Sequence, residues 1–393
     1  MFSHFVVWRG LAYNPPHSYE KLSVTATERI MPKTPITREK LRQTVRRDWG
    51  DLSHDEVVAA ACKYICRGCT VNDVRAELKA KLGVTLSRED PYRLLSYAGT
   101  RGWLQFRAPM AYDLADKLQE AHPCLEKVAV LRTAVSDDIS YYTARMLLDL
   151  VRQFHQKNPA RNTVRVGFAG GTALRKTARH FAAMLREPQD DLPRTIIFHA
   201  MVAGFDSKDT TAEPNSFFAY FVDEPELQVR TGFVGLHAPG LVKTASMRVL
   251  RALDHVRDAY EAAQSLDIVV TSAGGHWRQG HSALYDMYAK SSPRSLAVLN
   301  KAGCVGDMMW RPLGPEGPLE MRTEVRTMTL MELSELPGFI DRGGKVLLLL
   351  GPCGAAGCGG PKADVFRAIL HGSKNVTHIC VDSRSAKAVI EPA

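Results

Sequence analysis

The segment VRVGFAGGTALRKTARHF (164–181) combines residue types that can hold a phosphate group. Gly170 and Gly171 allow a tight backbone turn, Thr172 supplies a hydroxyl, and Arg175 and Lys176 add positive charge. If a helix begins at this turn, its first amide N–H groups and the positive end of its dipole favour an anion there. The segment is neither a Walker loop nor a clean dinucleotide fingerprint. Tight packing between a strand and a helix therefore explains it equally well when it is taken alone.

Three other glycine turns follow apolar segments, which strengthens the ligand interpretation. They are SAGGH (272–276), GCVGD (303–307) and GCGGPK (357–362). In an open α/β sheet, loops that follow strands meet at the carboxyl edge, where ligands bind. Several such loops, one of which has Lys362 after its glycines, favour a ligand that carries a phosphate.

Catalytic groups are also conceivable at this edge. Asp307, Asp382 and His276 are the available candidates, but the sequence has no Gly-x-Ser-x-Gly, HExxH or Walker motif to support them. The sequence therefore predicts a protein that is not an enzyme, with no catalytic residue. Many isomerases lack short motifs, so a sugar-phosphate isomerase or deaminase-like enzyme with an added helical domain is the alternative.

Eight cysteines are spread along the chain, as in a protein with reduced thiols rather than a disulfide framework. Cys62, Cys66 and Cys69 have the spacing of an iron–sulfur motif of radical enzymes. Two of them fall inside an expected helix, so packing as small hydrophobic residues is the favoured interpretation. Cys353 and Cys358 lie in a glycine-rich loop and could bind metal or be redox active, but no histidine is near them in sequence. No metal or cofactor is predicted.

A helix-turn-helix is predicted before the glycine turns. Ser53 and Glu56 form a capping box for a helix that reaches about Arg67, and a second helix runs from Thr70 to Gly83. Ser87 is expected to cap a third helix, Ser87–Thr100, and Gly102–Phe106 reads as a short strand, the wing of a winged helix.

The start of this third helix is expected to enter the major groove of DNA. Ser87, Arg88, Tyr92 and Arg93 would meet bases and phosphates there. A basic helix is expected to begin at Thr37, and its predicted DNA-binding residues are Arg38, Arg42 and Arg46. These residues and Lys79 would add contacts to the DNA backbone. A helical domain that binds protein through a basic face is the alternative.

After the predicted helix-turn-helix, the pattern changes to alternating strands and helices, which predicts a parallel α/β sheet covered on both faces. Residues 111–122 form an amphipathic connecting helix. The expected strands are Lys127–Arg132, Val164–Phe168, Thr195–Ala200, Ile268–Ser272, Val346–Leu350 and Thr377–Val381, with long helices at Ser136–Phe154 and Leu174–Leu185. The predicted domains are a loose tail (1–36), a winged helix-turn-helix (37–110), a linker helix (111–123) and an effector domain (124–393).

Composition excludes several classes of protein. Hydrophobic residues make up 45% and charged residues 24% of the 393 residues, which fits a globular chain with a sizeable core and not a disordered one. No apolar run reaches the roughly 20 residues that cross a bilayer. The first residues lack the basic start of a signal peptide, so a cytoplasmic protein without a membrane partner is expected. The formal charge of +9 favours polyanionic partners.

From about residue 53 to the end, the sequence resembles the SorC family of sugar-binding transcriptional regulators. The resemblance rests on an ordered series of segments: RLLSYAGTRGWLQF (93–106), LADKLQEAHPCLEKVAVLR (114–132), GFAGGTAL (167–174), HAPGLVKTASMRVL (237–250), LDIVVTSAGG (266–275), KAGCVGDM (301–308), GGPKADVFRAIL (359–370) and ICVDSRSAKAVI (379–390).

This resemblance implies a winged helix-turn-helix joined to an effector domain related in fold to glucosamine-6-phosphate deaminase and ribose-5-phosphate isomerase. It also implies a homo-oligomer, a dimer or tetramer, that binds a double-stranded DNA operator. A sugar or sugar phosphate would control DNA binding from a site at the positions that match: Gly170, Gly171, Thr172, Gly274, Asp307 and Lys362. The sequence departs from the family at Glu89, Asp90 and Pro91 and in the loop GPCGAAGCGG (351–360).

Overall fold

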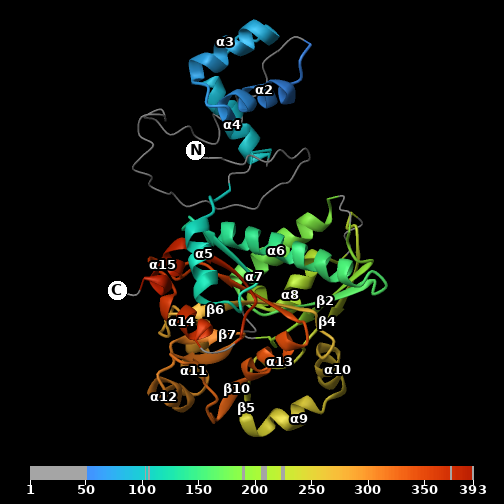
Figure 1. Ribbon diagram of the computed structural model, residues 1–393, viewed down its shortest axis with the longest axis vertical. Helices are drawn as coiled ribbons and strands as arrows, with labels where there is room; N and C mark the ends of the chain where they lie inside the picture. Colours follow the sequence, from blue (N-terminus) through green and yellow to red (C-terminus); the bar gives the residue numbers. More distant parts are fainter. Residues whose placement is uncertain are drawn as a thin grey trace. The chain divides into compact units, whose positions relative to one another are not determined.

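The computed structural model describes residues 51–101, 103–104, 107–187, 191–204, 210–222, 226–371 and 374–391. The chain forms two compact units, Met1–Arg107 and Ala108–Ala393 (Figure 1). The predicted tail (1–36) and the basic segment that holds Arg38, Arg42 and Arg46 lie outside the described residues.

Three helices make up the described part of the first unit: α2 (His54–Cys66), α3 (Val71–Leu82) and α4 (Asp90–Thr100). The Ser53 N–H donates to Glu56 Oε2 at 2.7 Å while the Glu56 N–H donates to Ser53 Oγ at 3.3 Å, so the predicted capping box starts α2. Thr70 and Asp73 cap α3 in the same way, and Gly83 ends it at a φ of +68°. The first two predicted helices are therefore confirmed.

The third helix begins three residues later than predicted. Pro91 has no N–H to donate, so it is tolerated in the first helical turn, and α4 starts at Asp90 to place it there. The Asp90 carboxylate accepts the Ser87 N–H at 2.6 Å, and no side chain caps the start of α4, so Ser87 does not make the predicted cap contact. Ser87 and Arg88 consequently lie in the turn before the helix.

The predicted wing is not seen in its described residues. Trp103 and Leu104 are not in a strand, and their N–H groups both donate to the Ala98 carbonyl, at 2.9 and 3.4 Å, which closes the end of α4. The other residues of the predicted strand, Gly102, Gln105 and Phe106, lie outside the described residues.

One hydrophobic core holds this three-helix unit together. Arg75 Nε also donates to the Leu86 carbonyl at 2.8 Å and fixes the turn between α3 and α4. Burial of the apolar side chains in this core supplies the main stabilisation of so small a unit. The buried residues of the core are Val57, Val58, Ala61, Cys62, Val74, Leu78, Val84, Leu86, Leu94, Ala98 and Leu104.

The second unit is built on a parallel sheet, as predicted. Its strands lie in the order β1-β12-β11-β6-β2-β3-β4, and all neighbours in this series are parallel. Their bounds are β1 (Lys127–Leu131), β2 (Thr163–Phe168), β3 (Thr195–Ala200), β4 (Arg230–Val234), β6 (Ile268–Gly275), β11 (Lys345–Leu350) and β12 (His378–Asp382). All six predicted strands are confirmed, and β4 was missed.

Helices cover the sheet, with α6 and α7 above it and α13 below it in the view of Figure 1. The predicted connecting helix is α5, which packs on β1 within this unit. The helices are α5 (Tyr112–Ala121), α6 (Ser136–Lys157), α7 (Thr172–Leu185), α8 (Pro214–Phe217), α9 (Met247–Arg251), α10 (Asp254–Ala263), α11 (Ala283–Ser291), α12 (Pro293–Lys301), α13 (Leu336–Asp341), α14 (Ala363–Leu370) and α15 (Ser383–Ile390).

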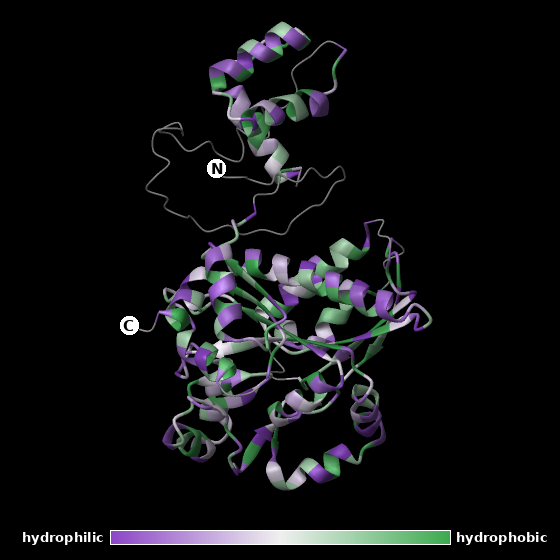
Figure 2. Ribbon diagram, viewed as in Figure 1, coloured by the Kyte–Doolittle hydropathy of each residue, from purple (hydrophilic) through white to green (hydrophobic). Residues whose placement is uncertain are grey.

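Short 3₁₀ turns and an antiparallel extension, which sequence reasoning did not predict, complete this unit. The extension continues from β6 through β7 (Gly306–Met308), β8 (Arg311–Gly314) and β9 (Gly317–Pro318), while β5 (Leu241–Lys243) pairs with β10 (Val325–Thr327). The 3₁₀ turns are η1 (Thr210–Ala212), η2 (Phe218–Tyr220), η3 (Thr244–Ser246) and η4 (Leu333–Glu335). The sheet strands are mainly hydrophobic (Figure 2). Among the described residues, no helix has the length and apolar character needed to cross a membrane.

Candidate functional site

The order of the strands fixes where a ligand site can form. From β2 the chain proceeds to β3 and β4 at one edge of the sheet, and then returns to β6 on the other side of β2 before filling β11 and β12. The direction therefore reverses between β2 and β6. Open α/β sheets bind ligands outside the carboxyl ends of the strands at such a reversal point, and the turns after β2 and within the end of β6 are the predicted Gly170–Thr172 and Gly274 turns.

The turn after β2 is held open by glycine. Gly171 has a φ of +127°, a conformation that side-chain-bearing residues rarely adopt, and a Cβ there would lie 3.3 Å from Ser272 Oγ on β6. Gly171 is the N-cap of α7, and no side chain caps this helix start. The first amides of α7 are thus placed to receive an anion, with exposed Thr172 at the first position.

The Gly274 turn brings Asp307 and Lys362 together. Gly274 is paired with Asp307 across the β6–β7 ladder, and a Cβ at Gly274 would overlap the Asp307 carboxylate. A Cβ at Gly275 would lie 2.7 Å from Lys362 Cγ, and Lys362 Nζ donates to the Ala273 carbonyl at 2.7 Å. Small residues at the end of β6 are therefore required for these two charged side chains to pack beside it.

Burial perturbs both charged groups. Removal from water raises the pKa of Asp307 to about 7, although the nearby Lys362 ammonium, the Ser282 hydroxyl and the Trp310 N–H each oppose the rise. Burial also lowers the pKa of Lys362, and the neighbouring Cys353, Asp307 and Asp382 oppose that fall. The Asp307 carboxyl is consequently poised between its charged and neutral forms near neutral pH.

Asp307 is positioned by a tight hairpin between β7 and β8. Met308 pairs with Arg311, so Met309 and Trp310 form a two-residue turn in which both have positive φ, 52° and 59°. This is the geometry of a type I′ turn, for which non-glycine residues are uncommon. The Trp310 N–H donates to the Asp307 carboxylate, so the strained turn aims a donor at the site.

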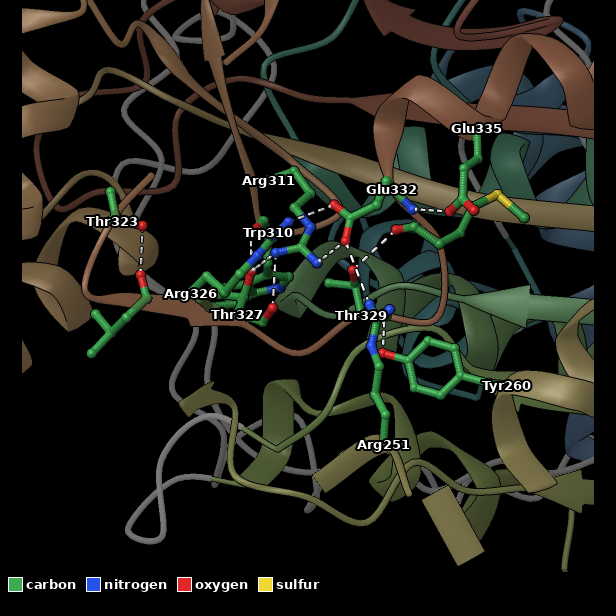
Figure 3. Close-up of polar contacts among 12 residues, drawn as sticks. Arg251, Tyr260, Trp310, Arg311, Thr323, Arg326, Thr327, Thr329, Glu332 and Glu335 are labelled. Carbon is green, nitrogen blue, oxygen red and sulfur yellow. Dashed lines mark hydrogen bonds and ion pairs between the residues drawn. The ribbon is translucent and has the colours of Figure 1, made fainter. Parts of the chain in front are cut away.

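A partly buried ion-pair network anchors the far side of this hairpin (Figure 3). Arg311 is only 5% exposed and donates to the Thr327 carbonyl at 2.8 Å and to Glu332 Oε1 at 2.7 Å. Arg326 donates to the other Glu332 oxygen at 2.9 Å, and the Thr327 hydroxyl donates to the Trp310 carbonyl at 2.6 Å. The network ties the turn that holds Asp307 to the segment before α13.

Lys362 is held by the end of β12. Its N–H donates to Ser385 Oγ at 3.2 Å, and that hydroxyl donates to Asp382 Oδ2 at 2.6 Å. Asp382 also accepts the N–H groups of Arg384 and Ser385, both at 3.0 Å, as the N-cap of α15. Asp382, a candidate catalytic residue in the sequence, therefore has its oxygens occupied by structural hydrogen bonds.

The structure thus brings some predicted site residues together and leaves others apart. At the end of β6, Gly274 lies against Asp307 and Gly275 against Lys362, the two charges are close enough to shift each other's pKa, and Gly171 lies near Ser272 of the same strand. Among the described residues, no hydrogen bond or ion pair joins Thr172 or Arg175 to Asp307 or Lys362; the Arg175 N–H donates to the Gly171 carbonyl at 3.0 Å. Sequence reasoning missed Ser272 and buried Ser282, whose hydroxyl donates to Asp307 Oδ2 at 3.4 Å. Isolated serines carry no motif that could have revealed them.

The predicted DNA-contacting residues of the first unit differ in their exposure and in their ion pairs. Ser87 and Arg88 are exposed in the turn before α4, and Tyr92 is half-buried. Arg93 instead pairs with Glu89 at 2.7 Å and with Asp90 at 3.7 Å. The acidic residues noted as departures from the family therefore neutralise one of the expected cations.

The first cysteine group does not form a metal cluster. Cys62 is buried in the core of the three-helix unit, where burial raises the pKa of its thiol to about 12, while Cys66 is exposed. These three cysteines are not among the groups of described residues whose ligand atoms lie close enough to hold a metal ion.

Comparisons with known proteins agree with this architecture. No protein-family model matches the sequence, and no curated protein sequence matches it. The solved full-length sorbitol operon regulator SorC from Klebsiella pneumoniae is similar, with a TM-score of 0.60 at 16% identity over 87% of this chain and 100% of that chain.

Two further solved structures each match 71% of the chain. A SorC family transcriptional regulator from Enterococcus faecalis gives a TM-score of 0.52 at 14% identity over 71% of this chain and 100% of that chain. A DeoR family transcriptional regulator from Listeria monocytogenes gives 0.51 at 18% identity over 71% and 98%. The predicted resemblance is confirmed at the level of fold: this chain shares the fold of the solved SorC-family regulators.

Proposed function

We propose that this protein is a DNA-binding transcriptional regulator whose operator binding is controlled by a sugar or sugar phosphate held in the second unit. Structural neighbours bear the names of a sorbitol operon regulator and of sugar-binding transcriptional regulators. The observation that carries the proposal is that Asp307 and Lys362, referred to here as the Asp307–Lys362 pair, both pack against the end of β6, beside the reversal point of the sheet. The proposal assigns the protein no catalytic step and places it in the cytoplasm.

The chemistry of the pair suits a sugar phosphate. Lys362 spends one donor on the Ala273 carbonyl, and an ammonium group has three, so donors remain for phosphate oxygens. The uncapped start of α7 offers amides for the same anion. When ionised, Asp307 accepts hydrogen bonds from sugar hydroxyls, which gives the site separate ends for the phosphate and the sugar.

The charge of the chain favours a nucleic acid partner for the first unit. Residues 1–107 contain 18 Lys and Arg against 11 Asp and Glu, so this unit has a net charge of +7, out of +9 for the whole chain. Positive charge supplies the phosphate affinity of a DNA-binding domain, and base contacts near Ser87, Arg88 and Tyr92 supply its specificity. A homo-oligomer would present two or more such units to operator half-sites, and effector binding would shift the population between arrangements.

Thermal unfolding in the presence of a panel of sugar phosphates, with inorganic phosphate and the unphosphorylated sugars beside it, tests the effector site. We expect one or a few sugar phosphates to raise the unfolding temperature of the full-length protein, and the Lys362→Ala variant to lose that rise. Lys374→Ala, which removes an exposed lysine paired to Asp341 on the surface, is the matched control. A rise that survives Lys362→Ala would place the effector elsewhere.

The same ligands separate the regulator from the isomerase or deaminase-like alternative. Each stabilising sugar phosphate is incubated with the purified protein and followed by phosphorus and proton NMR. A regulator returns the ligand unchanged, whereas turnover that Asp307→Asn abolishes would establish the enzyme instead.

Selection from a pool of random duplexes tests the DNA side. We expect enriched sequences with two half-sites, binding that weakens as salt rises, and a change of affinity when the effector is added. Absence of salt-dependent retention on any duplex would instead favour a helical unit that binds protein.

A further inference from the structure

A cluster of metal-ligating side chains lies at the carboxyl edge of the sheet, outside the Asp307–Lys362 pair. The ligand atoms of His276, Cys353 and Cys358 all lie within 4.8 Å of one another. Among the described residues, no other group of three histidine, cysteine or acidic side chains is this close. No local pattern joins these three residues, because His276 is far from both cysteines along the chain.

The parallel sheet makes this meeting possible. His276 directly follows β6 and Cys353 follows β11, and these are neighbouring parallel strands in which Leu349 pairs with Ser272. Their following residues therefore emerge side by side at the same edge. The histidine that a zinc site at these cysteines needs is supplied by the fold.

The glycine-rich loop after β11 brings the second thiol to the first. The Cys353 N–H donates to the Gly360 carbonyl at 2.9 Å, and the Cys358 N–H donates to the Ala355 carbonyl at 3.0 Å, so the loop folds back on itself. A Cβ at Gly360 would lie 3.5 Å from both Cys358 Sγ and His276 Nε2. Glycine at this position leaves the space between the ligand atoms unobstructed.

His276 has an unused nitrogen and a strained backbone. Its Nε2 atom is buried and has no hydrogen-bond partner among the described residues, which is a costly state for a polar atom. Its φ is +56°, a conformation that non-glycine residues adopt mainly where the surroundings impose it.

We propose that His276 Nε2, Cys353 Sγ and Cys358 Sγ bind one divalent cation of the zinc class. Two sulfurs and one imidazole nitrogen form a ligand set that zinc prefers, and three protein ligands leave a fourth, open position. Zinc–sulfur bonds of about 2.3 Å and zinc–nitrogen bonds of about 2.0 Å place tetrahedral ligand atoms roughly 3.5–3.8 Å apart. The ligand atoms, which lie within 4.8 Å of one another, therefore need to approach by about 1.3 Å at most to close on the ion.

Binding releases the two thiol protons as two metal–sulfur bonds form, with no change of oxidation state. The ion would lie beside the proposed effector site, since Gly275 separates His276 from Gly274 in the chain and packs on Lys362. This inference goes beyond the proposed function and does not depend on a sugar ligand or on DNA.

Cobalt(II) titration of the full-length protein tests the site directly. The protein is stripped with a chelator, kept reduced with a phosphine and titrated with Co²⁺, whose thiolate charge-transfer and d–d bands report ligand type and geometry. We expect one equivalent to bind with a two-thiolate, tetrahedral spectrum, and Zn²⁺ to displace it. Metal analysis after desalting should give one zinc per chain.

Three substitutions locate the ion. Cys353→Ser, Cys358→Ser and His276→Gln should each weaken Co²⁺ binding at least tenfold, and the two serine variants should lose about half of the charge-transfer intensity. Cys124→Ser and His255→Gln, which change half-buried and exposed residues away from the cluster, are the matched controls and should bind as the unmodified protein does. Circular dichroism of the metal-free variants verifies their folding.

Two results would overturn the proposal. The first is that the reduced protein binds no stoichiometric Co²⁺ or Zn²⁺. The second is that the three variants bind the metal as tightly as the controls do. A Cys353–Cys358 disulfide that forms in air in a protein that never binds metal would identify a redox pair in place of a metal site.

Discussion

The three-helix unit and the α/β unit use their charges in opposite ways. The first unit holds most of the excess positive charge, and the expected DNA-contacting cation Arg88 is exposed before α4. The second unit is nearly balanced, and the charges at its site, Asp307 and Lys362, are packed against the end of β6. Exposed charges act over long distances and are screened by salt, whereas buried charges act on their immediate neighbours and shift each other's pKa. The two units should therefore respond to different substitutions and different solution conditions.

The largest expected effect is a loss of sugar-phosphate affinity on substitution of Lys362, whose buried charge acts only on its immediate neighbours. Lys362→Ala removes the ammonium group from a partly desolvated site, and a lost charged hydrogen bond to phosphate should weaken sugar-phosphate affinity about 100-fold. Isothermal titration calorimetry measures the affinity of each variant for the sugar phosphate. Affinity for duplex DNA without effector should stay within about twofold of the unmodified protein, because the substitution leaves the first unit unchanged. An equal loss of both activities would remove the distinction between the units.

Gly274→Ala should give the next largest effect. The new methyl group would overlap the Asp307 carboxylate, and relief of such overpacking costs about 1–3 kcal/mol of unfolding free energy. Chemical denaturation measures this loss, and effector affinity should fall with it because Asp307 moves. Gly354→Ala is the matched control, since a Cβ there meets no atom within 4 Å. A Gly274→Ala protein as stable as the control would contradict the packing described here.

The sequence predicted the scaffold better than the site. Apolar runs such as Thr195–Ala200 and capping residues such as Ser53 and Thr70 act locally, so the six predicted strands and the first two helices are confirmed. Strand β4 was missed because Arg230–Val234 is short and mostly not buried. The predicted start of α4 at Ser87 was wrong because Pro91, which lacks an N–H, lies in the first turn of the helix and fixes the start at Asp90.

The site residues were found only in part, for a different physical reason. Gly171 and Gly274 could be read from the sequence because tight turns need glycine. Ser282 reaches Asp307 from another loop, and His276 meets Cys353 only because β6 and β11 are neighbours. Strand order is a property of the whole chain, and no local pattern in the sequence encodes it.

The pH dependence of the unfolding free energy should reveal the buried carboxyl of Asp307. The folded-state pKa of Asp307 is raised from 3.8 to about 7, so its contribution to stability is complete below pH 3.8 and is lost as pH rises through about 7. Asp307→Asn, which cannot ionise, should therefore gain stability relative to the unmodified protein as pH rises from about 4 to about 7. Urea denaturation across this range measures the difference.

Asp364→Asn is the control for this profile, because Asp364 is exposed and paired to Arg367 on the surface of α14. Its stability should follow that of the unmodified protein at every pH. A flat difference for Asp307→Asn would mean that Asp307 stays ionised in the folded protein.

The smallest expected effect separates two arginines of the first unit. Arg88 has no ion-pair partner among the described residues, whereas Arg93 is paired with Glu89 and Asp90. Arg88→Ala should lower the slope of log affinity against log salt by about one and weaken duplex binding several-fold at low salt. Arg93→Ala should change that slope less, because Glu89 and Asp90 already neutralise its charge. Fluorescence anisotropy on one duplex at several salt concentrations measures both, and the opposite ranking would mean that DNA displaces the carboxylates from Arg93 and takes their place.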